Sequence, residues 1–240
     1  MFEDKTLVAL GCSHTYGVYE QDLGSSPESI NSCFERSWAS KLSKLGNFKE
    51  VVNLSIPGGN NNRSERVLLN YLKKNSEKLI VIFTITELSR FETVNILSHT
   101  SDTITEIHDN YGYQTEGIWK VSEEAVDIKR RKFLEHYYVA MNHDVADTEA
   151  INRRVLLIST LLNSLKIEHY FIEMICKPDT IEQQQLGFKI PTISFQSKFG
   201  YNINAMNWMI EHFKPGTCGH FDHDANQALA DYIYKRISDE

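Results

Sequence analysis

Two short stretches of the 240-residue chain carry side chains that could do nucleophilic chemistry. The first, GCSHTYG, follows an apolar run and places Cys12, Ser13 and His14 between two glycines. The second, GTCGHFDHD, places His220 in a polar loop directly before a helical pattern. A serine hydroxyl becomes an effective nucleophile when an imidazole removes its proton, and histidine is suited to that role near neutral pH. The two stretches could therefore present a nucleophile and its base, hold a metal ion, or form ordinary turns.

A third stretch, NLSIPGGNNNRS at 53–64, combines turn-forming residues with polar ones. Its two glycines, Gly58 and Gly59, can take the positive φ that a tight turn requires. Its asparagines, Asn60 and Asn61, offer both donors and acceptors, which suits a hydroxyl-rich ligand such as a carbohydrate. We expect this stretch to form a polar rim around a substrate site.

Four apolar runs, rich in β-branched or aromatic residues, predict the strands that position these stretches. They lie at 6–10, 51–56, 79–85 and 169–175 and are nearly continuous in hydrophobicity, as in a parallel sheet covered on both faces. A weaker fifth candidate is TISFQ at 192–196.

Helical patterns with a period near 3.6 follow the runs. Their apolar positions are Trp38, Leu42 and Leu45; Val67, Leu68, Tyr71 and Leu72; Val126, Phe133, Tyr137 and Met141; Ile151, Val155, Ile158, Leu162 and Leu165; and Ala225, Leu229, Tyr232 and Ile233. This alternation of strands and helices along the chain predicts an α/β protein with a doubly wound parallel sheet. In such a sheet, ligands bind outside the carboxyl ends of the strands. We expect one domain over residues 1–240, with an irregular and helical insertion at about 91–165 and a β-hairpin around Tyr111, Gly112 and Tyr113.

Composition excludes several classes of protein. The net charge is -7 and no run of lysine or arginine forms a stripe, which argues against nucleic acid as a partner. No apolar stretch approaches the roughly 20 residues that span a bilayer, and the chain begins without a signal-peptide pattern. The four cysteines are widely scattered, as reduced thiols would be. We expect a cytoplasmic protein that binds no membrane; its oligomeric state is not predicted.

The order of the polar stretches resembles that of the SGNH (GDSL-type) hydrolase superfamily. The segment from Gly11 to Gly17 is similar to the first block of that family, Asn53 through Gly58 to its second, and GHFDHDANQALA to its last. The resemblance implies a three-layer, flavodoxin-like fold and ester hydrolysis without a metal or cofactor.

The resemblance also implies a role for each matching residue. It makes Ser13 the nucleophile and His220 the general base, and it places the amides of Ser13 and Gly58 in an oxyanion hole. The substrate that it implies is a small acyl ester, such as an O-acetyl group on a carbohydrate. Besides the two asparagines, we expect His14, Glu87 and Arg90 to contact the substrate; the Arg90 guanidinium could bind a carboxylate or phosphate.

The chain departs from the family pattern in its third block and at its triad acid. The third block normally supplies an asparagine side chain to the oxyanion hole, whereas TITELSR offers Thr86 or Glu87. Thr86 could donate one hydrogen bond, but an ionised Glu87 would repel an oxyanion. The acid normally lies three residues before the histidine, where this chain has Thr217. A backbone carbonyl, Thr217 or Asp222 could orient His220 instead.

Two alternatives stay open. A catalytically silent binding module would keep the pocket without the chemistry, and the missing asparagine and acid favour it. A Cys/His metal site would join Cys12 and His14 to Cys218 and His220, since two thiolates and two imidazoles suit zinc. The one-residue gap within each pair does not match the usual zinc spacings.

Overall fold

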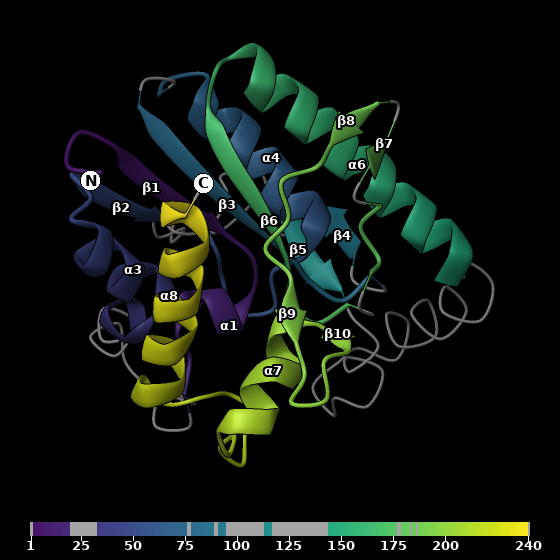
Figure 1. The fold of residues 1–240 in the computed structure, drawn as a ribbon. Helices are drawn as coiled ribbons and strands as arrows, with labels where there is room; N and C mark the ends of the chain where they lie inside the picture. The colour runs from purple at the N-terminus through teal and green to yellow at the C-terminus, as the bar shows by residue number, and fades with distance from the viewer. Residues whose placement is uncertain are drawn as a thin grey trace, which may run out of the picture.

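A computed structural model shows the fold and describes residues 2–19, 33–75, 78–88, 91–94, 113–116, 144–176, 179–182, 184–185 and 187–239. Four strands form a parallel sheet in the order β2-β1-β3-β6 (Figure 1). Their bounds are β1 Thr6–Leu10, β2 Glu50–Asn53, β3 Leu79–Ile85 and β6 Glu168–Glu173. In the register, Val8 of β1 lies between Val52 of β2 and Val81 of β3.

Helices cover both faces of this sheet (Figure 1). One face carries α3 (Trp38–Gly46), α7 (Ala205–His212) and α8 (His223–Ser238), and the other carries α4 (Asn61–Leu72) and α6 (Asp144–Ser164). The division follows the alternation of side chains along a strand. Leu7 and Ala9 of β1 belong to the first core, and Val8 and Leu10 to the second. The predicted doubly wound α/β architecture is confirmed.

The predicted strands at 6–10 and 79–85 coincide with β1 and β3. β2 ends at Asn53, three residues before the predicted end, because the Asn53 side chain accepts a hydrogen bond from the Ser55 backbone and turns the chain. The fifth candidate reduces to a parallel bridge between Thr192 and Phe171, followed by a short strand, β9 (Phe195–Gln196).

Two-residue strands form two small antiparallel pairs outside the main sheet. β9 pairs with β10 (Asn202–Ile203), and β7 (Gln184–Gln185) pairs with β8 (Phe188–Lys189).

The region between β3 and β6 differs from the sequence expectation in two ways. β4 (Phe91–Val94) pairs antiparallel with β5 (Tyr113–Glu116), so Tyr113 begins a strand and does not lie in a hairpin turn. α6 packs on the sheet through the predicted apolar positions from Ile151 to Leu162, so the end of the expected insertion belongs to the core. The expected helix carrying Val126 to Met141 lies outside the described residues.

The other helical patterns are confirmed, with two exceptions. Leu45 and Leu165 were expected in buried stripes, but both side chains are exposed, and Leu165 follows the last residue of α6. Among the described residues, no helix combines the length and the apolar character needed to cross a bilayer.

His169 forms a buried polar contact between β6 and α6. Its Nε2 lies 2.8 Å from Ser159 Oγ, and its Nδ1 lies 3.0 Å from the Ile167 carbonyl oxygen. Since a carbonyl only accepts, Nδ1 carries the proton and Nε2 accepts from the serine hydroxyl. Burial lowers the pKa of His169, although the Ile167 hydrogen bond and the nearby Glu168 oppose the shift.

This contact predicts a pH dependence of stability. The unfolded chain binds the His169 proton more readily than the folded chain, so the contribution is fully present above about pH 6.5 and is lost as the pH falls towards the lowered folded-state pKa. In urea titrations below about pH 6.5 we expect the free energy of unfolding to fall, by at most about 1.4 kcal/mol per pH unit for this proton. His169→Gln should show a shallower slope than the wild type, while the exposed-residue control His212→Gln should not. Identical slopes for His169→Gln and the wild type would refute the assignment.

Candidate active site

The turn after β1 presents Ser13 at the carboxyl end of the sheet. Ser13 begins a one-turn helix, α1 (Ser13–Tyr16), in which the Cys12 carbonyl accepts hydrogen bonds from the amides of Thr15 and Tyr16 at 3.0 and 2.9 Å. The helix ends at Gly17, whose φ of 92° lies in the left-handed region and whose amide donates to the Ser13 carbonyl at 3.0 Å. The backbone around Ser13 is therefore fixed on both sides.

The inner side of this turn is a pair of buried hydroxyls. Thr84 Oγ1 donates to the Leu10 carbonyl at 2.8 Å, and Thr15 Oγ1 lies 2.8 Å from Thr84 Oγ1. A Cβ at Gly11 would lie 1.9 Å from Thr84 Oγ1 and 2.5 Å from Thr15 Oγ1. Glycine is required at this position because the β3 side chain occupies the space that a methyl group would take.

The end of β2 is fastened to α1 by Asn53. Its Nδ2 donates to the Thr15 carbonyl at 2.9 Å, and its Oδ1 accepts from the Ser55 amide at 3.1 Å. The asparagine that the sequence placed in the second block thus joins the two stretches expected to form the site.

A tight turn follows at Ile56, Pro57, Gly58 and Gly59. The Gly59 amide donates to the Ile56 carbonyl at 3.0 Å, and Gly58 has a φ of 71°, as the third position of a type II turn requires. A Cβ at Gly59 would lie 2.5 Å from the Gly11 carbonyl oxygen, so this turn packs directly against the backbone that leads to the nucleophile stretch. A Cβ at Gly58 would meet nothing within 4 Å.

His220 lies in a short loop that is closed by its own hydrogen bonds. The Gly216 amide donates to the His220 carbonyl at 2.8 Å, and the Gly219 amide donates to the Gly216 carbonyl at 3.0 Å. The next residue, Phe221, is 2% exposed and belongs to the core beneath α3 and α8. His220 is therefore held between a closed loop and the hydrophobic core.

The start of α8 is fixed just beyond this loop. Asp222 is the N-cap residue, and its Oδ1 accepts from the Ala225 amide at 3.1 Å. On α3, Lys41 places its Nζ 2.8 Å from Nδ1 and 3.0 Å from Nε2 of His223, the first residue of α8. Burial lowers the pKa of Lys41. These contacts hold α8, and with it the His220 loop, against α3.

The side chains of Ser13 and His220 meet across 207 positions of sequence, with His220 Nε2 2.7 Å from Ser13 Oγ. Both residues are partly exposed. With Nε2 as the acceptor, the serine hydroxyl donates to the imidazole, which is the arrangement of a nucleophile and its base. The contact expected from the sequence is present.

The ring of His14 lies against the imidazole of His220. The ring centroids of His14 and His220 are 4.8 Å apart and the rings are tilted by 31°, while Phe221 lies 6.4 Å from His14. The sequence assigned His14 to substrate contact. Nothing in the sequence beyond its position next to Ser13 could have indicated this ring contact.

Three residues expected to face a substrate are buried. Asn60 is 0% exposed and caps α4 by accepting from the Arg63 amide at 2.8 Å. Asn61 is 3% exposed; its Oδ1 accepts from the Thr86 amide at 2.9 Å and from the Thr86 hydroxyl at 3.3 Å. The prediction of an exposed asparagine rim is wrong, because these amides hold the start of α4 and the end of β3.

The Thr86 hydroxyl, itself buried, donates to Asn61, which removes the basis for Thr86 as an oxyanion donor.

The remaining predicted residues lie at different depths. Glu87 is partly buried directly after β3, as its sequence position indicated, and Thr217 is exposed in the His220 loop. Arg90 lies outside the described residues.

The metal alternative finds no support in the arrangement of side chains. Within the described ranges, no three or more histidine, cysteine, aspartate or glutamate side chains are grouped so as to hold a metal ion. His14 and His220 do come together, but Cys12 and Cys218 do not complete a four-ligand set with them.

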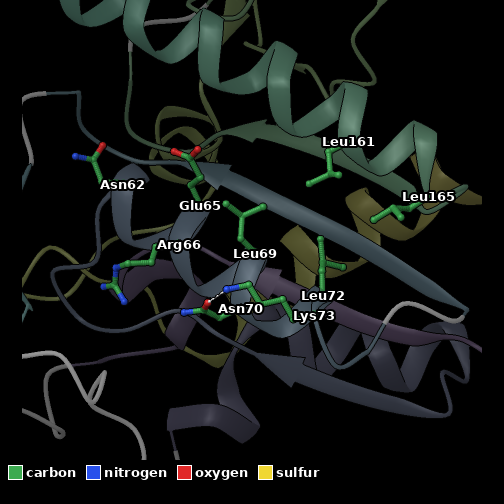
Figure 2. A pocket seen from close by; sticks show the side chains of 9 residues that line it. All are labelled: Asn62, Glu65, Arg66, Leu69, Asn70, Leu72, Lys73, Leu161 and Leu165. Atoms are coloured by element: carbon green, nitrogen blue, oxygen red, sulfur yellow. Dashed lines mark hydrogen bonds between the residues drawn. The ribbon is translucent and has the colours of Figure 1, made fainter.

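A separate concavity of about 610 Å³ lies between α4 and α6 (Figure 2). Its apolar part is formed by four leucines: Leu69, Leu72, Leu161 and Leu165. Its polar part is formed by charged and amide side chains: Asn62, Glu65, Arg66, Asn70 and Lys73. Neither Ser13 nor His220 lines it.

Comparison with known proteins gives no family model and no curated protein that matches the chain. Among solved structures, the chain is similar to the psychrotrophic esterase EstA from Pseudoalteromonas sp., solved inhibited by monoethylphosphonate, with a TM-score of 0.49, 11% identity and 98% coverage of both chains. It is also similar to a putative lipolytic protein of the G-D-S-L family from Desulfitobacterium hafniense, with a TM-score of 0.43, 10% identity and coverage of 97% of this chain and 99% of that one.

A third similar structure is a carbohydrate esterase whose active site is described as displaying divergent catalytic and non-catalytic binding functions. Its TM-score is 0.44 at 12% identity, with coverage of 99% of this chain and 66% of that one.

The close approach at Gly11 predicts a large effect of one added methyl group. Gly11 has a positive φ of 155°, and in Gly11→Ala the exit of β1 must also shift away from Thr84. We expect this shift to cost about 1–3 kcal/mol of unfolding free energy in addition to the backbone strain. Gly200→Ala is the matched control, because Gly200 also has a positive φ, of 83°, but its Cβ would meet nothing within 4 Å. The control should lose about 1 kcal/mol from backbone strain alone. Denaturant titrations measure both, and a Gly11→Ala loss no greater than the control would contradict the steric explanation.

Proposed function

We propose that this protein is a serine esterase that hydrolyses small acyl esters, with Ser13 as the nucleophile and His220 as the general base. The observation that carries the proposal is the 2.7 Å contact between Ser13 Oγ and His220 Nε2 at a partly exposed position. A hydroxyl hydrogen-bonded to a neutral imidazole can attack a carbonyl carbon while its proton passes to the ring.

In the proposed oxyanion hole, the backbone amides of Ser13 and Gly58 donate to the negative oxygen of the tetrahedral intermediate. Two features support this pairing. Gly59 packs on the Gly11 carbonyl, which brings the turn containing Gly58 to the nucleophile stretch, and the Cβ direction of Gly58 is open. Because the hydroxyl of Thr86 donates to Asn61, Thr86 is not part of the proposed hole.

The reaction then follows in two halves. As Ser13 Oγ bonds to the carbonyl carbon, His220 Nε2 takes the hydroxyl proton and later gives it to the oxygen of the departing alcohol, which leaves an acyl-serine. Water attacks the acyl carbon and loses a proton to the same imidazole, the bond to Oγ breaks, and the proton returns to Ser13 as the carboxylic acid departs. No group outside the chain is needed to balance either half.

The substrate class is limited to small acyl esters. The carbohydrate preference expected from the sequence depended on an exposed rim of Asn60 and Asn61, and both side chains are buried. Their burial removes the support for a carbohydrate preference.

The catalytically silent binding module is the second candidate. The observation in its favour is the bond between Thr86 and Asn61, since it leaves the site without the side-chain donor that the third block normally provides. Loss of one such donor costs about 2.7–4 kcal/mol in a transition state, which slows but does not abolish hydrolysis.

Removal of either member of the pair should abolish turnover. We expect Ser13→Ala and His220→Gln to lower kcat/KM for 4-nitrophenyl acetate by at least about 10⁴-fold with the fold retained, because the two residues act as one unit. The controls are Ser194→Ala and His212→Gln, at exposed positions away from the pair. A fluorophosphonate probe should phosphonylate Ser13 with loss of fluoride, which adds the mass of the phosphonyl group to the Ser13 peptide. A folded wild-type protein that neither hydrolyses such esters nor reacts with the probe would favour the binding module.

Asp222 could act on His220 either as the acid of a triad or through the position of the loop beside the helix that it caps. Since the exposed Asp222 carboxylate caps α8, we propose that it acts through the position of the loop. Asn is an equally good N-cap residue, so Asp222→Asn should keep both stability and kcat, whereas Asp222→Ala should lose about 1 kcal/mol of unfolding free energy. A fall in kcat of about 10⁴-fold in Asp222→Asn would instead identify Asp222 as the acid of a triad. Thr217 is the other side chain that could orient His220, and Thr217→Ala tests that role by the same measurement of kcat.

A further inference from the structure

Two consecutive residues of α1 contact the same imidazole. Ser13 contacts the edge of His220 through the hydrogen bond to Nε2, and His14 contacts the ring at 4.8 Å between centroids. His14 also lies 6.4 Å from Phe221, the buried residue that anchors the loop. The ring of His14 therefore packs between α1 and the segment that carries the proposed base.

We propose that His14 is a positioning residue for His220: its ring holds the imidazole toward Ser13, and its charge sets the pH at which that imidazole can accept a proton. The inference rests on the proposed function for its catalytic meaning. The ring contact and the electrostatic coupling that it implies can be tested without any substrate.

The steric part follows from the freedom of a histidine ring. Rotation about the last side-chain bond of histidine is broad, so a hydrogen bond from one ring nitrogen does not by itself fix the ring plane. A second ring packed at 31° to the first restricts that rotation. Since Ser13 and His14 are neighbours on α1, the backbone contacts that fix α1 place both of them relative to His220.

The electrostatic part follows from the distance. As His220 removes the serine proton, it gains a positive charge 4.8 Å from the His14 ring centroid. A neutral His14 presents its π system to that charge, which is favourable, whereas a protonated His14 opposes it. The two rings are therefore close enough for the charge of one to act on the other.

Other ionisable groups lie on the neighbouring segments. Cys218 and Asp222 lie on the His220 loop, His223 begins α8, and Lys41 of α3 contacts His223. These groups remain when His14 alone is replaced, so the difference between wild type and variant isolates His14.

The direct test is an NMR titration of the histidine ring protons. With His220 assigned through His220→Gln, we expect its titration midpoint to rise in His14→Phe, on the order of one pH unit, because the neighbouring charge is gone. His212→Phe is the matched control: it removes one imidazole on α7, which packs on Trp208, and should leave the His220 midpoint in place. If phenylalanine disturbs the fold, His14→Gln removes the same charge with a smaller side chain. An unchanged midpoint in the folded variant overturns the inference.

The kinetic test separates ring support from charge. We expect His14→Ala to lower the plateau of kcat by about 10- to 100-fold, the scale of a small misplacement of a catalytic group, and His14→Phe to recover most of that loss. The acid limb of the kcat/KM profile should move to higher pH in His14→Phe, in parallel with the NMR midpoint. A His14→Ala variant with wild-type kcat and an unmoved acid limb overturns the positioning role.

The outcomes distinguish the two proposals. If the wild-type protein is inactive but the His220 midpoint moves in His14→Phe, the ring coupling stands and the esterase proposal fails. If the wild-type protein is active and the midpoint does not move, the esterase proposal stands and the role of His14 is refuted.

Discussion

The hydrogen bond between Ser13 and His220 is the interaction on which the candidate site depends. The bond requires that both residues lie on segments with a fixed backbone. Ser13 follows β1, an inner strand with β2 on one side and β3 on the other. The chain passes from β1 to β2 on one side and then crosses to β3 on the other, which makes the end of β1 the topological switch point of the sheet. His220 reaches this point because Phe221 is buried under α3 and α8. The site therefore joins the most central part of the sheet to the last helix of the chain.

The strands and most helices of the described fold could be predicted because their residues are buried on one or both sides. β3 is buried along its whole length, and continuous burial produces the unbroken apolar run that was read as a strand. The pairing of β4 with β5 could not be predicted in the same way. The two strands are separated by residues 95–112, and the local Tyr-Gly-Tyr sequence indicates a turn without showing which distant segment pairs with it.

In the candidate site, the serine–histidine contact could be predicted and its polar surroundings could not. Ser13 and His220 belong to stretches that resemble the first and last blocks of one family, and the 2.7 Å contact agrees with the meeting that this resemblance implies. The sequence predicts Asn60 and Asn61 as ligand-binding because it does not distinguish an asparagine that caps a helix from one that binds a sugar. The difference arises from the tertiary contact with Thr86, which only the packing of α4 against the end of β3 creates. The same holds for His14, whose partner is more than 200 residues away in the sequence.

The burial of Phe221 has a consequence for how the protein would lose activity. The proposed base is one residue away from the apolar layer beneath α3 and α8, and the proposed nucleophile follows directly on the sheet. A sub-global opening that releases α8 and leaves the sheet intact would separate the pair without unfolding the chain. Turnover would then report the local stability of the C-terminal helix, and mild denaturant would inactivate the protein before the parallel strands exchange their amide hydrogens.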